Sequence, residues 1–249
     1  MLALSIILLI CVHCFAAPQK QNTLPRIIGG EQVDISQVPY QVAILLDGQQ
    51  NCGGTLISPT KVLTAQHCWI DGARISDYSV RVGSTDWEDG GQEIEITAFD
   101  IHDAPKGEIF TSYDIAVITL KSAVNVSNAV PIPVDDADTV HVTGEVATVS
   151  GWGITYDPFS PIPPNVTSDK YPLSAINSTV VSCGDGLDTI LCLSLNGTGA
   201  CYGDSGGPAV INGKLAGIVS GGICASYISP GFFTKVSAFR EWIKEHADV

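Results

Sequence analysis

The sequence predicts an all-β fold, either a sandwich or a barrel. Short runs rich in valine and isoleucine recur along the 249 residues, with turn residues between them. No helical segments alternate with these runs, so a parallel α/β fold is not expected. The scattered 25 glycines and 14 prolines suit a turn-rich β protein. The runs are "YQVAILL" (40–46), "YSVRVG" (78–83), "EIEITAFD" (93–100), "DIAVITL" (114–120), "EVATVSGWG" (145–153) and "KLAGIVSG" (214–221).

The N-terminal segment is apolar and ends in small side chains. We interpret residues 1–16 as a secretory signal peptide that is cleaved after Ala16. A membrane anchor is the alternative, but the run is shorter than the roughly 20 apolar residues that a spanning helix needs. The mature protein is therefore expected to be secreted and extracellular.

One helix is predicted at the C-terminus, over residues 237–247. Ser237 can cap its first turn. Four apolar residues recur at the three- and four-residue spacing of a single helix face, which is expected to pack on the body of the protein. They are Val236, Phe239, Trp242 and Ile243.

Six cysteines remain beyond the signal peptide, and an even number in a secreted chain indicates three disulfides. The sequence alone allows 15 pairings among them. No CxxC pair or histidine cluster has the spacing of a zinc site, so no metal is expected. The six are Cys52, Cys68, Cys183, Cys192, Cys201 and Cys224.

The composition is strongly acidic, with a formal net charge of −14. This charge disfavours nucleic acid and anionic membranes as partners, and we interpret it as favouring solubility in an extracellular fluid. Four N-x-S/T sequons are candidate glycosylation sites, expected on surface loops. They are Asn125, Asn165, Asn177 and Asn196.

Three residues are candidates for nucleophilic catalysis. Ser205 lies in "GDSGGP", where glycines permit a tight turn and the N–H groups of Gly203 and Ser205 can face a developing oxyanion. A serine hydroxyl needs a neighbouring base, and His67 in "LTAQHC" is the candidate. Asp114 opens an apolar run, where a carboxylate needs a hydrogen-bonded partner such as a histidine N–H. Taken singly, each has a structural alternative: a glycine-rich turn, a structural histidine, or a strand cap.

Together, the three occur in the order His67, Asp114, Ser205, which is the order of the chymotrypsin type of serine protease. On this order and on seven segments, the chain resembles the secreted, chymotrypsin-like serine proteases of the trypsin fold (the S1 family). The segments are "RIIGG" (26–30), "CGGTLIS" (52–58), "LTAQHC" (63–68), "DIAVITL" (114–120), "SGWG" (150–153), "CYGDSGGP" (201–208) and "PGFFTKV" (230–236).

The resemblance implies two antiparallel six-stranded Greek-key β-barrels with the active site between them and a C-terminal α-helix. It implies an activation propeptide over 17–26 and a protease domain over 27–249. The barrels would cover approximately 27–133 and 134–236, with the helix over 237–247. The implied disulfides are Cys52–Cys68, Cys183–Cys192 and Cys201–Cys224.

The resemblance also implies a mechanism, which is the one established for this type of protease. Ser205 would attack the scissile carbonyl and form an acyl-enzyme. His67 would pass the proton to the leaving amine, and Asp114 would orient the imidazole. The N–H groups of Gly203 and Ser205 would form the oxyanion hole, and no cofactor would be needed.

The segment "PRIIGG" resembles a zymogen activation site. Cleavage after Arg26 would free the amine of Ile27. By resemblance, that ammonium would pair with Asp204, since a buried charge persists only when it is paired. The activating enzyme would itself be trypsin-like, because the cut follows an arginine.

The resemblance assigns the floor of the specificity pocket to Gly199, where trypsins carry an aspartate. The other pocket residues would be Ala200, Ser220, Gly222 and Gly231. This uncharged pocket favours chymotrypsin-like cleavage after Phe, Tyr or Leu, and an elastase-like preference for small side chains is the alternative. An aspartate introduced at position 199 is expected to shift the preference toward basic residues.

Two departures from the family pattern lie near the site. Gln66 stands where the family has alanine, and Gly221 stands where an aromatic residue usually lines the cleft. They keep a second hypothesis open, a non-catalytic homologue that acts as a binding module, although the complete triad favours an enzyme. The expected partners are protein or peptide substrates, the activating protease and protein inhibitors. A monomer without bound calcium is expected.

Overall fold

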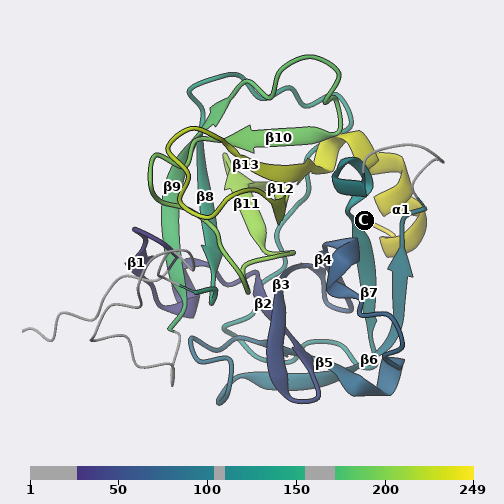
Figure 1. Cartoon of the computed structure of the whole chain (residues 1–249). Helices are drawn as coiled ribbons and strands as arrows, with labels where there is room; N and C mark the ends of the chain where they lie inside the picture. Colours follow the sequence, from purple (N-terminus) through teal and green to yellow (C-terminus); the bar gives the residue numbers. More distant parts are fainter. Residues whose placement is uncertain (1–26, 104–109, 155–171) are drawn as a thin grey trace, which may run out of the picture.

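The described strands close into two antiparallel β-barrels, which lie one above the other in Figure 1. The computed structural model describes residues 27–103, 110–154 and 172–249. The expected signal peptide, the propeptide and Asn165 therefore lie outside the described residues. The two barrels confirm the fold expected from the resemblance.

The first barrel has the strand order β2-β3-β4-β7-β6-β5. Its side chains alternate between the interior and the surface, as in β5, where Tyr78, Val80 and Val82 are buried and Ser79 and Arg81 are partly exposed. The strands are β2 (Gln41–Leu46), β3 (Gln49–Ser58), β4 (Lys61–Thr64), β5 (Tyr78–Val82), β6 (Gln92–Ile101) and β7 (Ala116–Leu120).

The second barrel runs β8-β9-β10-β13-β12-β11 and closes by pairing β11 with β8. A short strand, β1 (Glu31–Gln32), adds to β9 from outside the ring. The strands are β8 (Val146–Gly151), β9 (Ser174–Val181), β10 (Ile190–Leu193), β11 (Pro208–Ile211), β12 (Lys214–Gly221) and β13 (Gly231–Lys235).

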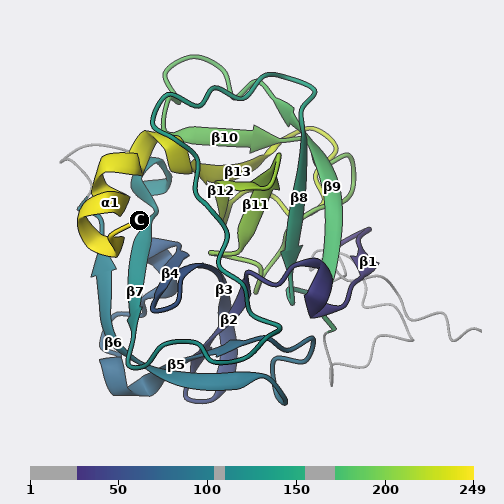
Figure 2. The same ribbon diagram turned by 180° about the vertical axis from the view of Figure 1, so that it is seen from behind.

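Helical structure is limited to short segments. Five 3₁₀ turns are described: η1 (Ile35–Gln37), η2 (Gln66–Cys68), η3 (Ile75–Asp77), η4 (Phe110–Tyr113) and η5 (Val236–Phe239). One α-helix follows, α1 (Arg240–Ala247), which lies beside β7 in Figure 2. Among the described residues, none of the helices has the length and apolar character needed to cross a membrane.

The C-terminal helix confirms the predicted face but not the predicted cap. Val236, Phe239 and Ile243 are buried, and Trp242 packs against the same core. Ser237 does not cap α1, because the tighter turn η5 comes first and the helix begins at Arg240. The buried Ser237 hydroxyl instead donates to the carbonyl oxygen of Thr139, over 3.3 Å.

Buried contacts fix one barrel against the other. Leu215 and Ile218 of β12 belong to the same apolar cluster as the first-barrel interior. Near β2, the buried Ser150 hydroxyl of the second barrel donates to Oε1 of Gln41 over 2.6 Å. Because close packing and buried hydrogen bonds resist sliding, side chains carried by different barrels keep a constant relative position.

Candidate active site

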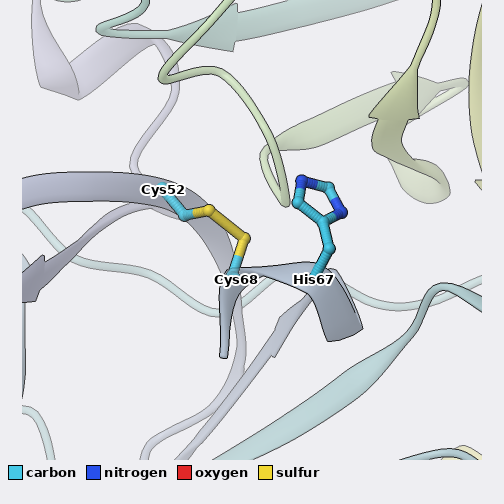
Figure 3. A group of neighbouring side chains, drawn as sticks. All are labelled: Cys52, His67 and Cys68. Atoms are coloured by element: carbon cyan, nitrogen blue, oxygen red, sulfur yellow. A yellow bond between two sulfur atoms is a disulfide. The ribbon is translucent and has the colours of Figure 1, made fainter. Parts of the chain in front are cut away.

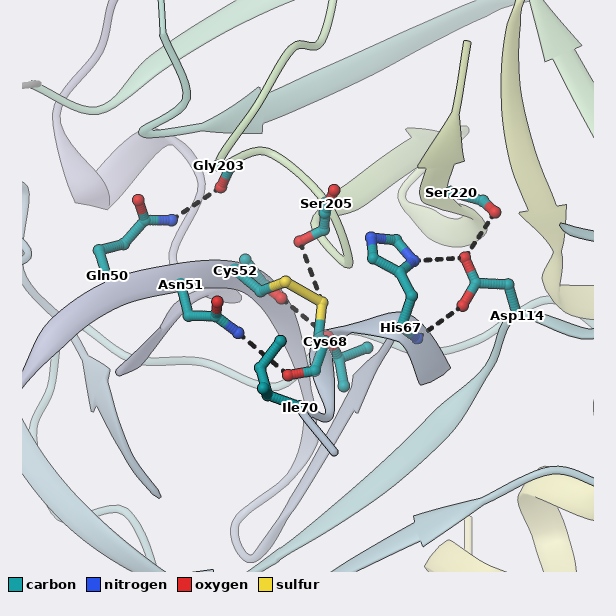
Figure 4. The surroundings of a disulfide bond; sticks show 12 residues. Gln50, Asn51, Cys52, His67, Cys68, Ile70, Asp114, Gly203, Ser205 and Ser220 are labelled. Atoms are coloured by element: carbon teal, nitrogen blue, oxygen red, sulfur yellow. Dashed lines mark hydrogen bonds and ion pairs between the residues drawn. A yellow bond between two sulfur atoms is a disulfide. The ribbon is translucent and has the colours of Figure 1, made fainter. Parts of the chain in front are cut away.

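His67 and Asp114 form a directly hydrogen-bonded pair (Figure 4). Nδ1 of His67 lies 2.7 Å from Oδ2 of the fully buried Asp114. The backbone N–H of His67 donates to the other carboxylate oxygen over 3.0 Å. Because a carboxylate accepts but does not donate, the neutral imidazole carries its proton on Nδ1. Nε2 is then left as the proton acceptor, which is what a general base requires.

Asp114 accepts two further hydrogen bonds from the second barrel. The Ser220 hydroxyl, on β12, donates to Oδ2 of Asp114 over 2.6 Å. The Thr234 hydroxyl, on β13, donates to the backbone carbonyl of Asp114 over 2.7 Å. The Ser220 bond helps to offset the cost of burying the carboxylate, and the Thr234 bond fixes the backbone that carries it.

The chain segment around His67 is held from several sides. β4 ends at Thr64, and the turn η2 then turns His67 away from the sheet. The next residue, Cys68, is bonded to Cys52, and its carbonyl accepts from Asn51 and from the Tyr78 hydroxyl. The imidazole therefore sits on a backbone that cannot shift easily.

Ser205 lies in the loop that precedes β11. Figure 4 shows the His67 ring between Ser205 and Asp114. The Ser205 carbonyl accepts the N–H of Gly53 over 2.7 Å, which ties this loop to the first barrel. Gly206 has φ +77°, and a β-carbon there would overlap the Thr64 hydroxyl, so only glycine fits behind the serine. The structure thus brings together all three residues that the sequence suggested.

Gly203, the predicted oxyanion donor, has φ +93°. Its carbonyl oxygen accepts Nε2 of Gln50, on β3, over 2.7 Å. Gln50 was not among the predicted site residues, since a lone glutamine in a strand carries no signal of this role. The contact depends on a fold that brings β3 beside the second-barrel loop.

Asp204 is fully buried beside Ser205. Its carboxylate accepts the N–H groups of Gly153, over 2.8 Å, and of Cys201, over 3.0 Å. Burial raises the pKa of Asp204 to about 7 despite these bonds. Gly153 is required here, because a β-carbon would overlap the carboxylate. Ile27, at the start of the described chain, is also fully buried.

A cavity of about 300 Å³ opens beside His67 and Ser205, which line it. Four of the five predicted pocket residues line it: Ala200, Ser220, Gly222 and Gly231. Gly199 does not. The side chain of Leu195 lies over it, and a β-carbon on Gly199 would overlap Cδ2 of Leu195. An aspartate at position 199 therefore could not simply extend into the pocket.

Several lining residues were missed by the sequence analysis. Leu195 lies in an ordinary loop segment, "LSLNGTG", with no motif to mark it. Tyr202 and Ile223 line the cavity and are 60% and 56% exposed, which places them at its mouth. Of the two departures noted above, Gly221 lines the cavity, and Gln66 lies directly before His67 with a buried, unpartnered Oε1.

The three expected disulfides are present. Cys52 bonds Cys68, Cys183 bonds Cys192, and Cys201 bonds Cys224. Cys52, His67 and Cys68 lie close enough together to suggest a metal site (Figure 3). The sulfurs of Cys52 and Cys68 are bonded to each other, however, so neither cysteine offers the thiolate that would bind a metal.

Three of the sequons lie on described residues, and all three asparagines are exposed. Asn125 and Asn196 are on loops, as expected. Asn177 is not on a loop but within β9, where its Oδ1 accepts the Thr148 hydroxyl over 3.0 Å. The short sequon does not distinguish an exposed strand position from a loop.

Comparison with known proteins agrees with this geometry. A family model described as Trypsin matches residues 27–243. Hypodermin-B of Hypoderma lineatum is 34% identical over 262 residues, which cover 98% of each chain. Trypsin alpha of Drosophila melanogaster is 32% identical over 257 residues, covering 100% of this chain and 99% of its own.

The fold is also shared with a solved protease. The structure titled neuropsin, a serine protease expressed in the limbic system of mouse brain, matches with a TM-score of 0.75 and 28% identity. The match covers 88% of this chain and 99% of that one. Fold, site geometry and relatives agree, and the chain belongs to the trypsin family and is a serine endopeptidase.

Proposed function

We propose that this endopeptidase hydrolyses peptide bonds through Ser205, His67 and Asp114. The observation that carries the proposal is the bond between His67 Nδ1 and the buried Asp114 carboxylate, over 2.7 Å. It leaves Nε2 of His67 to take the proton of the Ser205 hydroxyl as that oxygen attacks the carbonyl carbon. The imidazolium formed is stabilised by Asp114 and then protonates the leaving amine.

The acyl-enzyme is then hydrolysed in a second step, in which His67 acts again first as a base and then as an acid. A water molecule takes the place of the amine, and its oxygen bonds to the acyl carbon while His67 Nε2 takes its proton. As the bond between that carbon and Ser205 Oγ breaks, the imidazolium returns the proton to Oγ, which releases the acid product and restores the Ser205 hydroxyl. In both steps the carbonyl oxygen becomes an oxyanion, which the N–H groups of Gly203 and Ser205 would bind. The positive φ of Gly203 and its anchored carbonyl support this assignment.

The protein is further proposed to be a secreted zymogen, activated by cleavage after Arg26. Asp204 supports this, because a buried carboxylate with a pKa of about 7 gains strongly from a cationic partner. The amine freed at Ile27 is such a cation, and Ile27 is buried in the structure. The backbone pairing of Ile28 with Gly199 would transmit the change to the specificity pocket.

The substrate side chain that enters the cavity is proposed to be large and apolar. Ala200, Gly222 and Gly231 bring no charge to the cavity and do not narrow it. An elastase-like preference for small side chains is the alternative, and it would need bulkier residues at these positions. Hydrophobic pockets separate side chains by about 1–3 kcal/mol per methylene, so the two preferences overlap.

A fluorophosphonate probe tests the catalytic proposal. After cleavage at Arg26 the protein is expected to be labelled at Ser205, and Ser205→Ala should fold normally but take no label. The Arg26→Gln precursor should be labelled far more slowly. If the cleaved protein takes no label, the alternative hypothesis of a non-catalytic binding module gains support.

A peptide panel tests specificity. Peptides that differ only in the residue before the cut are expected to be cleaved after Phe and Leu, whereas cleavage chiefly after Lys or Arg would contradict an uncharged pocket. Glycosylation of the exposed Asn125, Asn177 and Asn196 is also proposed. Mass spectrometry before and after removal of N-glycans would show which asparagines carry them.

A further inference from the structure

Leu195 holds the position that a floor side chain would take in the specificity pocket. It follows β10, is 5% exposed and lines the cavity beside the triad. Its Cδ2 lies 2.4 Å from the position of a β-carbon on Gly199 and 3.1 Å from that of a β-carbon on Gly231. One leucine side chain thus covers both glycines at this end of the cavity.

Two backbone groups at this end of the cavity, the Leu195 carbonyl and the Gly199 N–H, are already hydrogen-bonded. The Leu195 carbonyl accepts the N–H of Thr198 over 2.7 Å and the Thr198 hydroxyl over 2.5 Å. The Gly199 N–H donates to the carbonyl of Ile28 over 2.8 Å. Since Leu195 also covers Gly199, neither backbone group remains to bind a polar atom that reaches the bottom of the cavity.

None of the described polar side chains that line the cavity is free to bond a substrate group at the Leu195 end, because each lies at the mouth, belongs to the proposed catalytic residues or is already hydrogen-bonded. His67 and Ser205 carry the chemistry, the Ser220 hydroxyl is given to Asp114, and the exposed Tyr202 is at the mouth. Gly231 lies against Leu195, and the apolar side chains of Ala200, Val219 and Phe233 also line the cavity. A hydroxyl brought to this end would lose its water without gaining a hydrogen bond from any of these side chains, which is unfavourable.

We propose that Leu195 closes the specificity pocket and makes the protease discriminate phenylalanine from tyrosine before the scissile bond. The inference rests on the proposed function and narrows its substrate class to side chains with an apolar tip: Phe, Leu and Met. The two aromatic residues differ only in the para hydroxyl, which points toward the floor. kcat/KM for Phe is expected to exceed that for Tyr by about tenfold or more, within the range of selectivity available to an apolar pocket.

The test compares two peptides that are identical except for Phe or Tyr before the cut. Leu195→Ala removes the floor methyl groups, gives depth and lets water reach the hydroxyl. The Phe to Tyr ratio of kcat/KM should then fall to about one. Leu191→Ala is the matched control, because Leu191 is equally buried in the same barrel but does not line the cavity. Its ratio should stay at the wild-type value.

The ratio is independent of the amount of active enzyme, so partial folding of a variant does not disturb it. Wild-type cleavage after Tyr as efficient as after Phe would overturn the proposal, whether or not any variant folds. So would an unchanged ratio in Leu195→Ala that takes the fluorophosphonate label fully. Leu195→Val, a smaller truncation, should give an intermediate ratio.

Failure of the proposed function gives a different result. In that case the wild-type protein takes no label and cleaves neither peptide. The selectivity of the pocket can still be measured without turnover. The measurement is the Kd with which Ser205→Ala binds peptides that end in Phe or in Tyr. Preference for Phe that disappears in Ser205→Ala/Leu195→Ala would support the role of Leu195, and equal Kd values in the parent would refute it.

Discussion

Gln50 donates a hydrogen bond from Nε2 to the backbone carbonyl oxygen of Gly203, over 2.7 Å. The donor belongs to β3 of the first barrel and the acceptor to the catalytic loop of the second. The bond therefore crosses the site. It restrains the peptide that joins Gly203 to Asp204, directly after the proposed oxyanion donor.

Gln50→Ala is expected to lower kcat by about three- to tenfold with KM within about twofold. A neutral hydrogen bond contributes about 1 kcal/mol, and its loss here loosens a group that acts on the transition state. Steady-state kinetics and the affinity of a peptide aldehyde would measure the effect. Gln49→Ala is the control, because among the described residues the Gln49 amide bonds the adjacent Gly48 carbonyl and not Gly203. A raised KM with unchanged kcat would contradict the role.

Ser220→Ala should reduce kcat by about tenfold or more. The substitution removes the hydroxyl that donates to Asp114 over 2.6 Å and leaves a buried carboxylate with one donor fewer. Hydrogen bonds to charged groups contribute about 1.5–3 kcal/mol, and the loss should fall on the orientation of His67. Kinetics at saturating substrate would show it. Ser220→Thr, which keeps the hydroxyl, should recover part of the rate, and an equal loss in both variants would speak against the hydrogen bond.

Gly199→Asp is expected to destabilise the protein without creating cleavage after Lys or Arg. The residue has φ +124°, a conformation that costs a side chain about 1–3 kcal/mol, and its β-carbon would overlap Leu195. Chemical denaturation and the peptide panel would check both effects.

Ala200→Asp is the comparison for this variant, because Ala200 lines the cavity and lacks a positive φ. Its carboxylate should allow the Ala200→Asp variant to cleave peptides with Lys or Arg before the cut to a measurable extent. If Gly199→Asp instead cleaves after Arg efficiently at unchanged stability, Leu195 does not block this position.

His141 is expected to make stability depend on pH. Its side chain is 5% exposed, with Nε2 lying 2.6 Å from Asp135 and Nδ1 lying 2.9 Å from Glu145. These hydrogen bonds, chiefly that of Asp135, raise the pKa of His141 above its ordinary 6.5, against the lowering effect of burial. The nearby Lys214 pairs with Asp136 instead.

A histidine with a raised pKa stabilises the fold fully below the unfolded value of 6.5 and loses that contribution as the pH rises through the folded value. The free energy of unfolding of wild type relative to His141→Gln should therefore be greatest below about pH 6.5 and should shrink above it. Urea denaturation from pH 5.5 to 9 would measure the difference. A difference that grows with pH would have the wrong sign.

The sequence by itself determined the β class, the family and the identity of the three catalytic candidates. Strand runs are local patterns of valine and isoleucine, and β5 and β12 appear where those patterns place them. The order of His67, Asp114 and Ser205 is likewise readable along the chain. The helix cap was misread, because a serine before an apolar stripe does not reveal that a tighter turn intervenes.

Only the tertiary structure decided what surrounds those candidates. Gln50 meets Gly203 across 153 positions of sequence, and Ser220 meets Asp114 across 106. Leu195 lies over Gly199, which is in the same loop, and also beside Gly231 at the start of β13, a contact that no local sequence pattern encodes. The type of chemistry depends on which residues are present and in what order, so it can be predicted from the sequence. The hydrogen bonds of Gln50 and Ser220 depend on packing between the barrels, and the depth of the pocket depends on packing within the second barrel, so both are seen only in the tertiary structure.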